Sequence, residues 1–211
     1  MAGQMAKDDV IKACLQGVKN AQVQYVDMAG EWISWGPEYF ITTHIAQALH
    51  KATGSKFVTV ENGARNALEA ANATGRGRLH RDIRSEGRFD LLLWRANESP
   101  RAVIEVKNWV VSKSQYEPDL KRILEVLGRK SAANSISFGL FAFYTDADSS
   151  SKNAAVDIID SRMELILKNA REIVGSKFKV SLSSRGIRSN SRMERDGDSA
   201  WAACCLLIEP K

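Results

Sequence analysis

The strongest constraint on the fold is a pair of strand-like segments, RFDLLLWR (88–95) and RAVIEVKNWV (101–110), joined by ANESP. The link is short and contains a proline, which is typical of a β-hairpin. A third segment, SFGLFAFYTD (137–146), is almost wholly apolar, as expected for a strand that is covered on both faces. These three segments predict a sheet at the centre of the chain.

Helical patterns flank this sheet on both sides of the sequence, with Gly36 and Pro37 marking the start of one helix and Pro118 the start of another. In chain order we expect a helix over 7–28, a helix between Pro37 and Gly54, a strand over 56–61, a helical turn or two over 64–72, the hairpin, a helix from Pro118, the apolar strand, a helix over about 150–174, and strands over 177–185 and 200–210. This order predicts an α/β fold with a mixed central sheet flanked by helices.

Length and composition limit the classes of protein to which the chain can belong. A length of 211 residues suits one domain, here with a core of about 35–146, an N-terminal helical extension (1–34) and a C-terminal helix and strands (147–211). No apolar run approaches the roughly 20 residues of a membrane span, and the first residues lack the pattern of a secretory signal. The three cysteines form no CxxC pair, which favours a reducing environment. We therefore expect a cytoplasmic protein without a membrane partner.

The third expected strand has unusual charges for a segment of its kind. Because side chains alternate along a strand, Glu105 and Lys107 share one face with Val103, and Ile104 lies on the other. Asp90 lies near the start of the neighbouring strand. In an antiparallel hairpin the start of one strand is close to the end of the other, so Asp90 can approach Glu105 and Lys107.

Two carboxylates and an ammonium in one place indicate a particular chemistry. Carboxylates that face each other in a partly desolvated site repel, and a divalent cation removes this penalty. Hard oxygen ligands completed by water and phosphate suit Mg²⁺. A neighbouring lysine can hold and polarise the attacking water while it neutralises phosphate. These are the requirements of phosphodiester hydrolysis.

Asp90, fourteen intervening residues and Glu105-Val106-Lys107, within αβββαβ order, resemble the PD-(D/E)xK nuclease superfamily over roughly residues 35–146. The resemblance implies a restriction-endonuclease-like fold. It also implies Mg²⁺, with Mn²⁺ as a substitute, bound by Asp90, Glu105 and the backbone carbonyl of Val106, with Lys107 serving the attacking water. Phe89 replaces the nominal proline before the aspartate, at a position that varies in the family.

A further carboxylate is a candidate for the same site. Glu38 begins a series of positions, 38, 41, 45 and 49, that follows one face of the second expected helix. A glutamate at the head of this core-facing stripe points towards the sheet, and many members of the superfamily similarly bring a glutamate from the first core helix to the metal. The alternative is a favourable charge in the first turn of the helix. Glu61 is a weaker candidate of the same kind.

Basic residues concentrate in two turn-rich segments of a chain with a net charge of +5. Clustered guanidinium groups are typical of proteins that bind phosphate-bearing partners, and solvated surface loops are the alternative. The first cluster holds Arg76, Arg78, Arg81, Arg84 and Arg88, the second holds Arg185, Arg188, Arg192 and Arg195, and Lys121 and Arg122 on the outward face of a helix are lesser candidates. Trp32 and Trp35 are candidates for stacking on bases, although packing is the more common role of such residues.

Together these observations lead to the hypothesis of a Mg²⁺-dependent endonuclease that hydrolyses DNA, in restriction or phage defence. A small nuclease of this kind suits a homodimer, with one site for each strand and contacts through the N-terminal helix or the segment after residue 150. An E-x-K pair also occurs by chance on surface strands. The alternatives are therefore a catalytically silent nucleic-acid-binding module on the same fold and a protein-inhibitor module whose basic loops meet an acidic partner.

Overall fold

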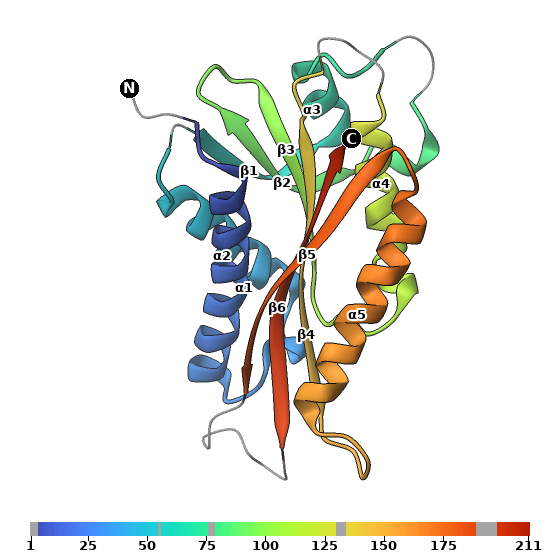
Figure 1. Ribbon diagram of the computed structural model, residues 1–211. Helices are drawn as coiled ribbons and strands as arrows, with labels where there is room; N and C mark the ends of the chain where they lie inside the picture. The colour runs from blue at the N-terminus through green and yellow to red at the C-terminus, as the bar shows by residue number, and fades with distance from the viewer. Residues whose placement is uncertain (1–3, 55, 76–78, 130–133, 189–197) are drawn as a thin grey trace.

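A mixed six-stranded sheet forms the centre of the computed structural model, which describes residues 4–54, 56–75, 79–129, 134–188 and 198–211 (Figure 1). Its strand order is β1-β2-β3-β4-β6-β5. The strands are β1 (Lys56–Gly63), β2 (Arg88–Arg95), β3 (Pro100–Lys107), β4 (Phe138–Asp148), β5 (Phe178–Arg188) and β6 (Ser199–Pro210). Only β3 and β4 pair in parallel, and every other pair of neighbours is antiparallel. The expected α/β class with a mixed sheet is confirmed.

Helices cover both faces of the sheet (Figure 1). On one face lie α1 (Lys7–Ala29) and α2 (Glu38–Lys51), and on the other lie α3 (Ala64–Ala70), α4 (Glu117–Leu127) and α5 (Ala155–Val174). Short 3-10 helices are η1 (Ile33–Trp35), η2 (Arg81–Ile83) and η3 (Lys113–Gln115). Among the described residues, none of the helices combines the length and the apolar character that crossing a bilayer requires.

The two-face pattern of β3 follows from the alternation of its side chains. Ile104 and Val106 pack with α1 and α2, whereas Val103 packs with α4 and α5. The sheet thus separates two hydrophobic cores, and the side chains of β3 enter them alternately. Glu105 is two residues from Val103, so it lies on the same face and points to the α4 side.

Close packing of α1 against α2 fixes the position of the second helix. A Cβ atom at Gly17 would lie 2.5 Å from the Cα of Ile45, so only glycine permits this approach. Ile41, Ile45 and Leu49 form the buried stripe expected for α2. The start of α2, at Glu38, is held in this way beside the end of β3.

The end of β3 and the start of α5 differ from the boundaries that the sequence pattern suggests. β3 stops at Lys107 instead of continuing to residue 110, because Trp109 adopts a left-handed backbone conformation with φ 53° that ends the extended chain. α5 begins at Ala155 instead of near residue 150. The early end of β3 brings the functional candidates to a strand terminus instead of a strand interior.

Candidate active site

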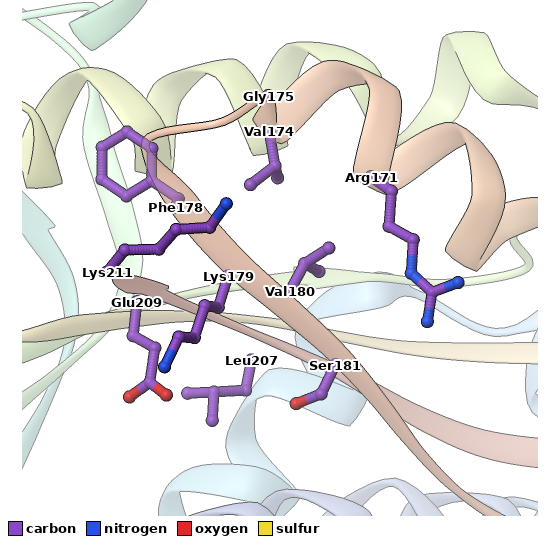
Figure 2. Close-up of a pocket in the computed structure, with 10 residues that line it drawn as sticks. All are labelled: Arg171, Val174, Gly175, Phe178, Lys179, Val180, Ser181, Leu207, Glu209 and Lys211. Carbon is purple, nitrogen blue, oxygen red and sulfur yellow. The ribbon is translucent and has the colours of Figure 1, made fainter.

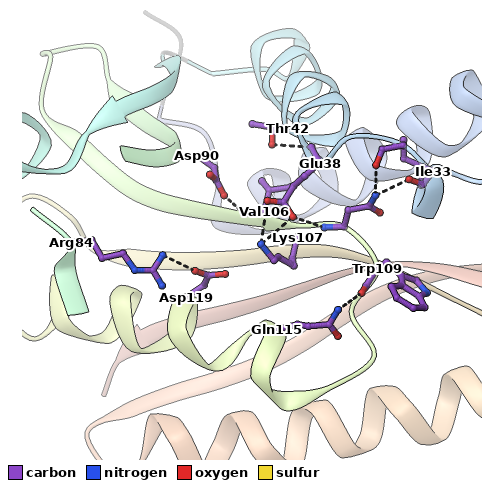
Figure 3. Close-up of polar contacts among 12 residues, drawn as sticks. Ile33, Glu38, Thr42, Arg84, Asp90, Val106, Lys107, Trp109, Gln115 and Asp119 are labelled. Atoms are coloured by element: carbon purple, nitrogen blue, oxygen red, sulfur yellow. Dashed lines mark hydrogen bonds and ion pairs between the residues drawn. The ribbon is translucent and has the colours of Figure 1, made fainter. Parts of the chain in front are cut away.

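The strands β2 and β3 separate at the end of their ladder, and this opening forms the candidate active site. Their pairing reaches Leu91 and Ile104, while β3 continues to pair with β4 as far as Lys107. Asp90 uses the open edge: its Oδ2 accepts a hydrogen bond from the backbone N–H of Val106 at 2.7 Å (Figure 3). Because the N–H and C=O of one strand residue point to the same edge, the Val106 carbonyl also lies on the side of Asp90.

Asp90 and Glu105 bring two carboxyl groups together at this opening. Glu105 is buried, at 2% exposure, and Asp90 is partly buried. Burial raises the pKa of Asp90 and raises the pKa of Glu105 well above its ordinary value, and the two carboxyl groups interact directly. Burial therefore disfavours the charged forms of both carboxyl groups, and a cation between them would offset this cost.

Arg122 faces inward, contrary to the expectation that it is an outward-facing DNA contact. Its Nη1 lies 3.0 Å from Oε1 of Glu105, and both side chains are 3% exposed. The guanidinium also donates to the carbonyls of Ile83 and Arg88 and lies 4.3 Å from the centroid of the Phe89 ring. The expectation was wrong because position 122 lies on the side of α4 that meets the sheet, where the buried carboxylate of Glu105 provides an ion-pair partner.

Lys107 and Glu38 form a second ion pair at the end of β3 (Figure 3). The Nζ of Lys107 lies 3.2 Å from Oε2 of Glu38 and 3.3 Å from its Oε1. Burial disfavours the Lys107 ammonium, but the charge of Glu38 and the other carboxylates outweighs this effect and raises the pKa of Lys107. The lysine is therefore held as a cation near Glu38, Asp119 and Asp90.

Asn108 fixes the segment before α2 to the end of β3. Its backbone N–H donates to Oε2 of Glu38 at 3.0 Å. Its side-chain amide donates to the carbonyls of Ile33 and Gly36, at 2.7 Å and 2.9 Å. Asn108 was not predictable from the sequence, because an asparagine after a strand is indistinguishable from an ordinary loop residue until the fold brings η1 next to it.

Asp119 is a further carboxylate that sequence reasoning missed. Its side chain is 14% exposed, and its Oδ1 lies 3.6 Å from Nη1 of Arg84 (Figure 3). Burial raises the pKa of Asp119, and the positive charges of Lys107 and Arg84 oppose that shift. From the sequence alone, Asp119 is indistinguishable from a favourable charge in the first turn of a helix. Only the docking of α4 against the sheet brings it to the site.

The donor set at the opening is compatible with Mg²⁺. Oε1 of Glu105 is buried and has no hydrogen-bond partner of good geometry, although the Arg122 guanidinium is at ion-pair distance from it. Across the described residues, no cluster of three or more His, Cys, Asp or Glu side chains is arranged to hold a metal ion. The fit therefore rests on two carboxylates and one backbone carbonyl, and Mg²⁺ is commonly bound through one or two carboxylates with water in its remaining positions.

The predicted basic residues have different surroundings. Arg76 and Arg78 lie outside the described residues, as do Arg192 and Arg195 of the second cluster. Arg81 is 91% exposed, Arg88 is exposed at the start of β2, and Arg84 reaches the site through Asp119. Lys121 pairs with Glu117 at 2.9 Å on the surface of α4. The described arginines of the first cluster therefore extend from the surface towards the strand that carries Asp90.

Glu61, the weaker carboxylate candidate, is exposed near the end of β1 and has φ 54°. A separate hollow of about 520 Å³ lies at the end of α5, beside β5 and β6 (Figure 2). The residues that line it are Arg171, Val174, Gly175, Phe178, Lys179, Val180, Ser181, Leu207, Glu209 and Lys211. It shares no residue with the opening between β2 and β3.

Comparison with protein-family models, with curated proteins and with solved structures finds no match for this chain. Inference about function therefore depends on the geometry of the chain itself.

Proposed function

We propose that this chain is a divalent-metal-dependent deoxyribonuclease of the PD-(D/E)xK type, with a restriction-endonuclease-like core. The observation that carries the proposal is the meeting of Asp90 with Glu105, while Lys107 follows on the same strand. Two acidic groups with raised pKa values and an adjacent lysine suit a site that takes a divalent cation and a phosphate. In the cell, we propose a role in restriction or phage defence in the cytoplasm.

In this proposal Asp90, Glu105 and the Val106 carbonyl hold Mg²⁺, and Mn²⁺ is a substitute. When bound, the cation polarises the scissile phosphate and offsets its charge. The charges of Glu38 and the other carboxylates raise the pKa of Lys107, and in this proposal its ammonium donates hydrogen bonds to the attacking water and a phosphate oxygen. Glu38 orients the ammonium through the two contacts of its carboxylate.

The DNA backbone is proposed to lie along the exposed arginines that lead into β2, with Lys121 as a lesser contact. Cutting both strands of a duplex requires two sites, so a homodimer with one site for each strand is part of the proposal. Arginine suits this role because its guanidinium binds phosphate oxygens in a bidentate manner.

One observation favours the rival function, a nucleic-acid-binding module without catalysis. The Arg122 guanidinium already neutralises Glu105, at 3.0 Å from the oxygen that the metal would use. If this ion pair persists when DNA and Mg²⁺ are present, the site lacks one of its ligands. Cleavage and binding must therefore be measured separately.

The proposal is tested with plasmid DNA in Mg²⁺, in Mn²⁺ and in EDTA. We expect cleavage in both metals and none in EDTA. Lys107→Ala should lower the cleavage rate by about 10²- to 10³-fold, the usual effect of removing one electrostatic contact to the transition state. Binding of DNA in EDTA should persist in this variant, and Lys51→Ala, which removes an exposed lysine at the end of α2, should cut at close to the wild-type rate.

Three outcomes would overturn the proposal. Unchanged cutting by Lys107→Ala would rule out the mechanism. Binding by the wild-type protein without cleavage in either metal would support the rival, non-catalytic module. Absence of DNA binding even at low salt, where phosphate contacts are strongest, would favour a protein-interaction role.

A further inference from the structure

Two tryptophans are unusually exposed beside the candidate active site. The side chain of Trp35 is 82% exposed and that of Trp109 is 46% exposed. Trp35 ends η1, just before Glu38, and Trp109 follows Lys107 by two residues. Indole rings normally contribute to stability by burial, so exposed rings at this place contribute little to packing.

The backbone segments that carry these tryptophans are bound to one another. The side-chain amide of Asn108 donates to the carbonyls of Ile33 and Gly36, which lie on either side of Ser34 and Trp35. The side chains of Ser34 and Trp109 both hydrogen-bond to the partly buried carboxyl group of Asp146. The two tryptophans therefore extend from one connected surface, next to the Lys107–Glu38 pair.

The conformation of Trp109 is a second, independent observation. Its φ of 53° lies in the left-handed region, which costs an L-residue with a bulky side chain roughly 1–2 kcal/mol. Neighbouring hydrogen bonds hold it there: Gln115 donates to the Trp109 carbonyl at 3.0 Å (Figure 3), and the N–H of Val110 donates to the backbone carbonyl of Tyr144 at 2.9 Å. Backbone strain that the surrounding structure maintains is characteristic of functional sites.

We propose that Trp35 and Trp109 form a stacking surface for the unpaired bases that flank the scissile phosphate. Single-stranded DNA is then a substrate, and duplex DNA is cut only where it opens locally at the scissile phosphate, because the base faces inside a duplex are already covered by neighbouring bases. This inference rests on the proposed nuclease function and specifies its substrate. Each exposed indole can stack on one base, and the Lys107 ammonium, two residues before Trp109 and paired with Glu38, can contact the intervening phosphate.

The Lys107 ammonium close to the two tryptophan segments favours a nucleic-acid strand over an apolar partner. It belongs to a polar network in which Asn108 and Lys107 both contact Glu38. A single strand alternates flat bases with negative phosphates, and this alternation matches aromatic rings next to a cation. The net charge of +5 is favourable for such a partner.

The test compares two labelled oligonucleotides in EDTA, in which cleavage cannot occur: a strand of about 12 thymidines and a strand of equal length in which most positions are abasic. We expect Trp35→Ala to weaken binding of the thymidine strand by about fivefold or more, the lower end for loss of stacking on one base. Binding of the abasic strand should change little, because its phosphates remain.

Trp35→Phe is the matched variant, because its smaller ring still stacks, and it should retain most of the wild-type affinity. Leu165→Ala removes an exposed apolar side chain, 55% exposed on α5, and should change neither affinity. Equal weakening for both oligonucleotides, or no weakening by Trp35→Ala, would overturn the stacking proposal.

Failure of this inference and failure of the nuclease proposal give different results. If the wild-type protein cuts DNA in Mg²⁺ but Trp35→Ala treats both oligonucleotides alike, the nuclease proposal stands and the stacking surface is rejected. If no cleavage occurs but affinity still depends on the bases and on Trp35, the stacking surface is supported and the protein binds DNA without cutting it.

Discussion

Two ion pairs join the end of β3 to two different helices, and they differ most in their exposure to solvent. Glu105 pairs with Arg122 of α4, and both side chains are 3% exposed. Lys107 pairs with Glu38 of α2, with side chains 32% and 37% exposed. The distances are similar, at 3.0 Å and 3.2 Å, so geometry does not distinguish them.

The difference in burial gives the two pairs different roles. Removing one partner of a buried pair leaves an uncompensated charge in a medium that solvates it poorly, which is strongly destabilising. A partly exposed pair contributes little to stability, because water and salt screen it. The Arg122–Glu105 pair therefore holds α4 to the sheet, whereas Lys107 has a charge that can reach a ligand.

The largest expected effect is on stability when the buried pair is broken. Arg122→Ala leaves Glu105 without its cation and should lower the free energy of unfolding by about 3–5 kcal/mol. Urea denaturation of the metal-free protein measures this loss. Lys121→Ala, at the exposed neighbouring position, should change stability by no more than about 0.5 kcal/mol.

A loss smaller than about 1 kcal/mol in Arg122→Ala would show that the pair does not stabilise the fold. The double variant Arg122→Ala/Glu105→Gln sharpens this test. Because the neutral amide needs no counter-charge, the double variant should be more stable than Arg122→Ala alone.

The second prediction concerns the dependence of stability on pH. Burial raises the pKa of Glu105 despite the charge of Arg122, and it also raises the pKa of Asp90. A carboxyl group with a raised folded-state pKa contributes stability that is fully present below its unfolded pKa, about 4, and is lost as the pH rises through the folded value. In EDTA, the free energy of unfolding should therefore fall as the pH rises above about 4.

Glu105→Gln removes the larger of the two titrations. The fall in its free energy of unfolding as the pH rises should therefore be smaller than that of the wild type, by about 1 kcal/mol or more. Denaturation in EDTA at a series of pH values provides the measurement. Adding Mg²⁺ should reduce the loss at high pH in the wild type only. Parallel profiles for the two proteins would contradict the assignment of the shared titration to Glu105.

The smallest expected effect on stability comes from the exposed pair. Glu38→Gln removes the charge that faces Lys107 but keeps an oxygen that can accept from the N–H of Asn108. Its unfolding free energy should fall by no more than about 1 kcal/mol. If the nuclease proposal holds, the cleavage rate of this variant should fall more than its stability suggests, because Lys107 is less well oriented. A large loss of stability with unchanged cleavage would reverse the roles of the two pairs.

Much of the fold was predictable because it follows from local patterns. The segment 88–95 coincides with β2, and 138–146 of the second segment lies in β4, since apolar runs of β-type residues have few other stable structures. The alternation of Val103, Ile104, Glu105 and Val106 between two faces was also predictable, because it follows from strand geometry. The end of β3 was not predictable, because Trp109 and its left-handed backbone depend on the neighbouring elements.

The candidate site was predictable in the part that one hairpin contains and, from the apolar stripe of α2, at Glu38. Asp90, Glu105 and Lys107 are close because two consecutive strands pair, and the sequence indicates this pairing. Arg122 was expected on the surface because an arginine beside Lys121 has the pattern of a solvated residue. Its ion-pair partner, Glu105, is on another element, and the sequence does not indicate this contact. Asp119 was missed for the same reason.

Three properties follow from the sequence alone. They are the order of helices and strands, the alternation of side chains along β3, and the placement of a carboxylate and a lysine at the end of β3. These properties depend on residues that are close along the chain. Tertiary structure alone decided that Arg122 is buried against Glu105, that Glu38 holds Lys107, and that two tryptophans share one surface. Each of these depends on the angle and distance at which a helix or loop packs on the sheet, and local propensity does not specify them.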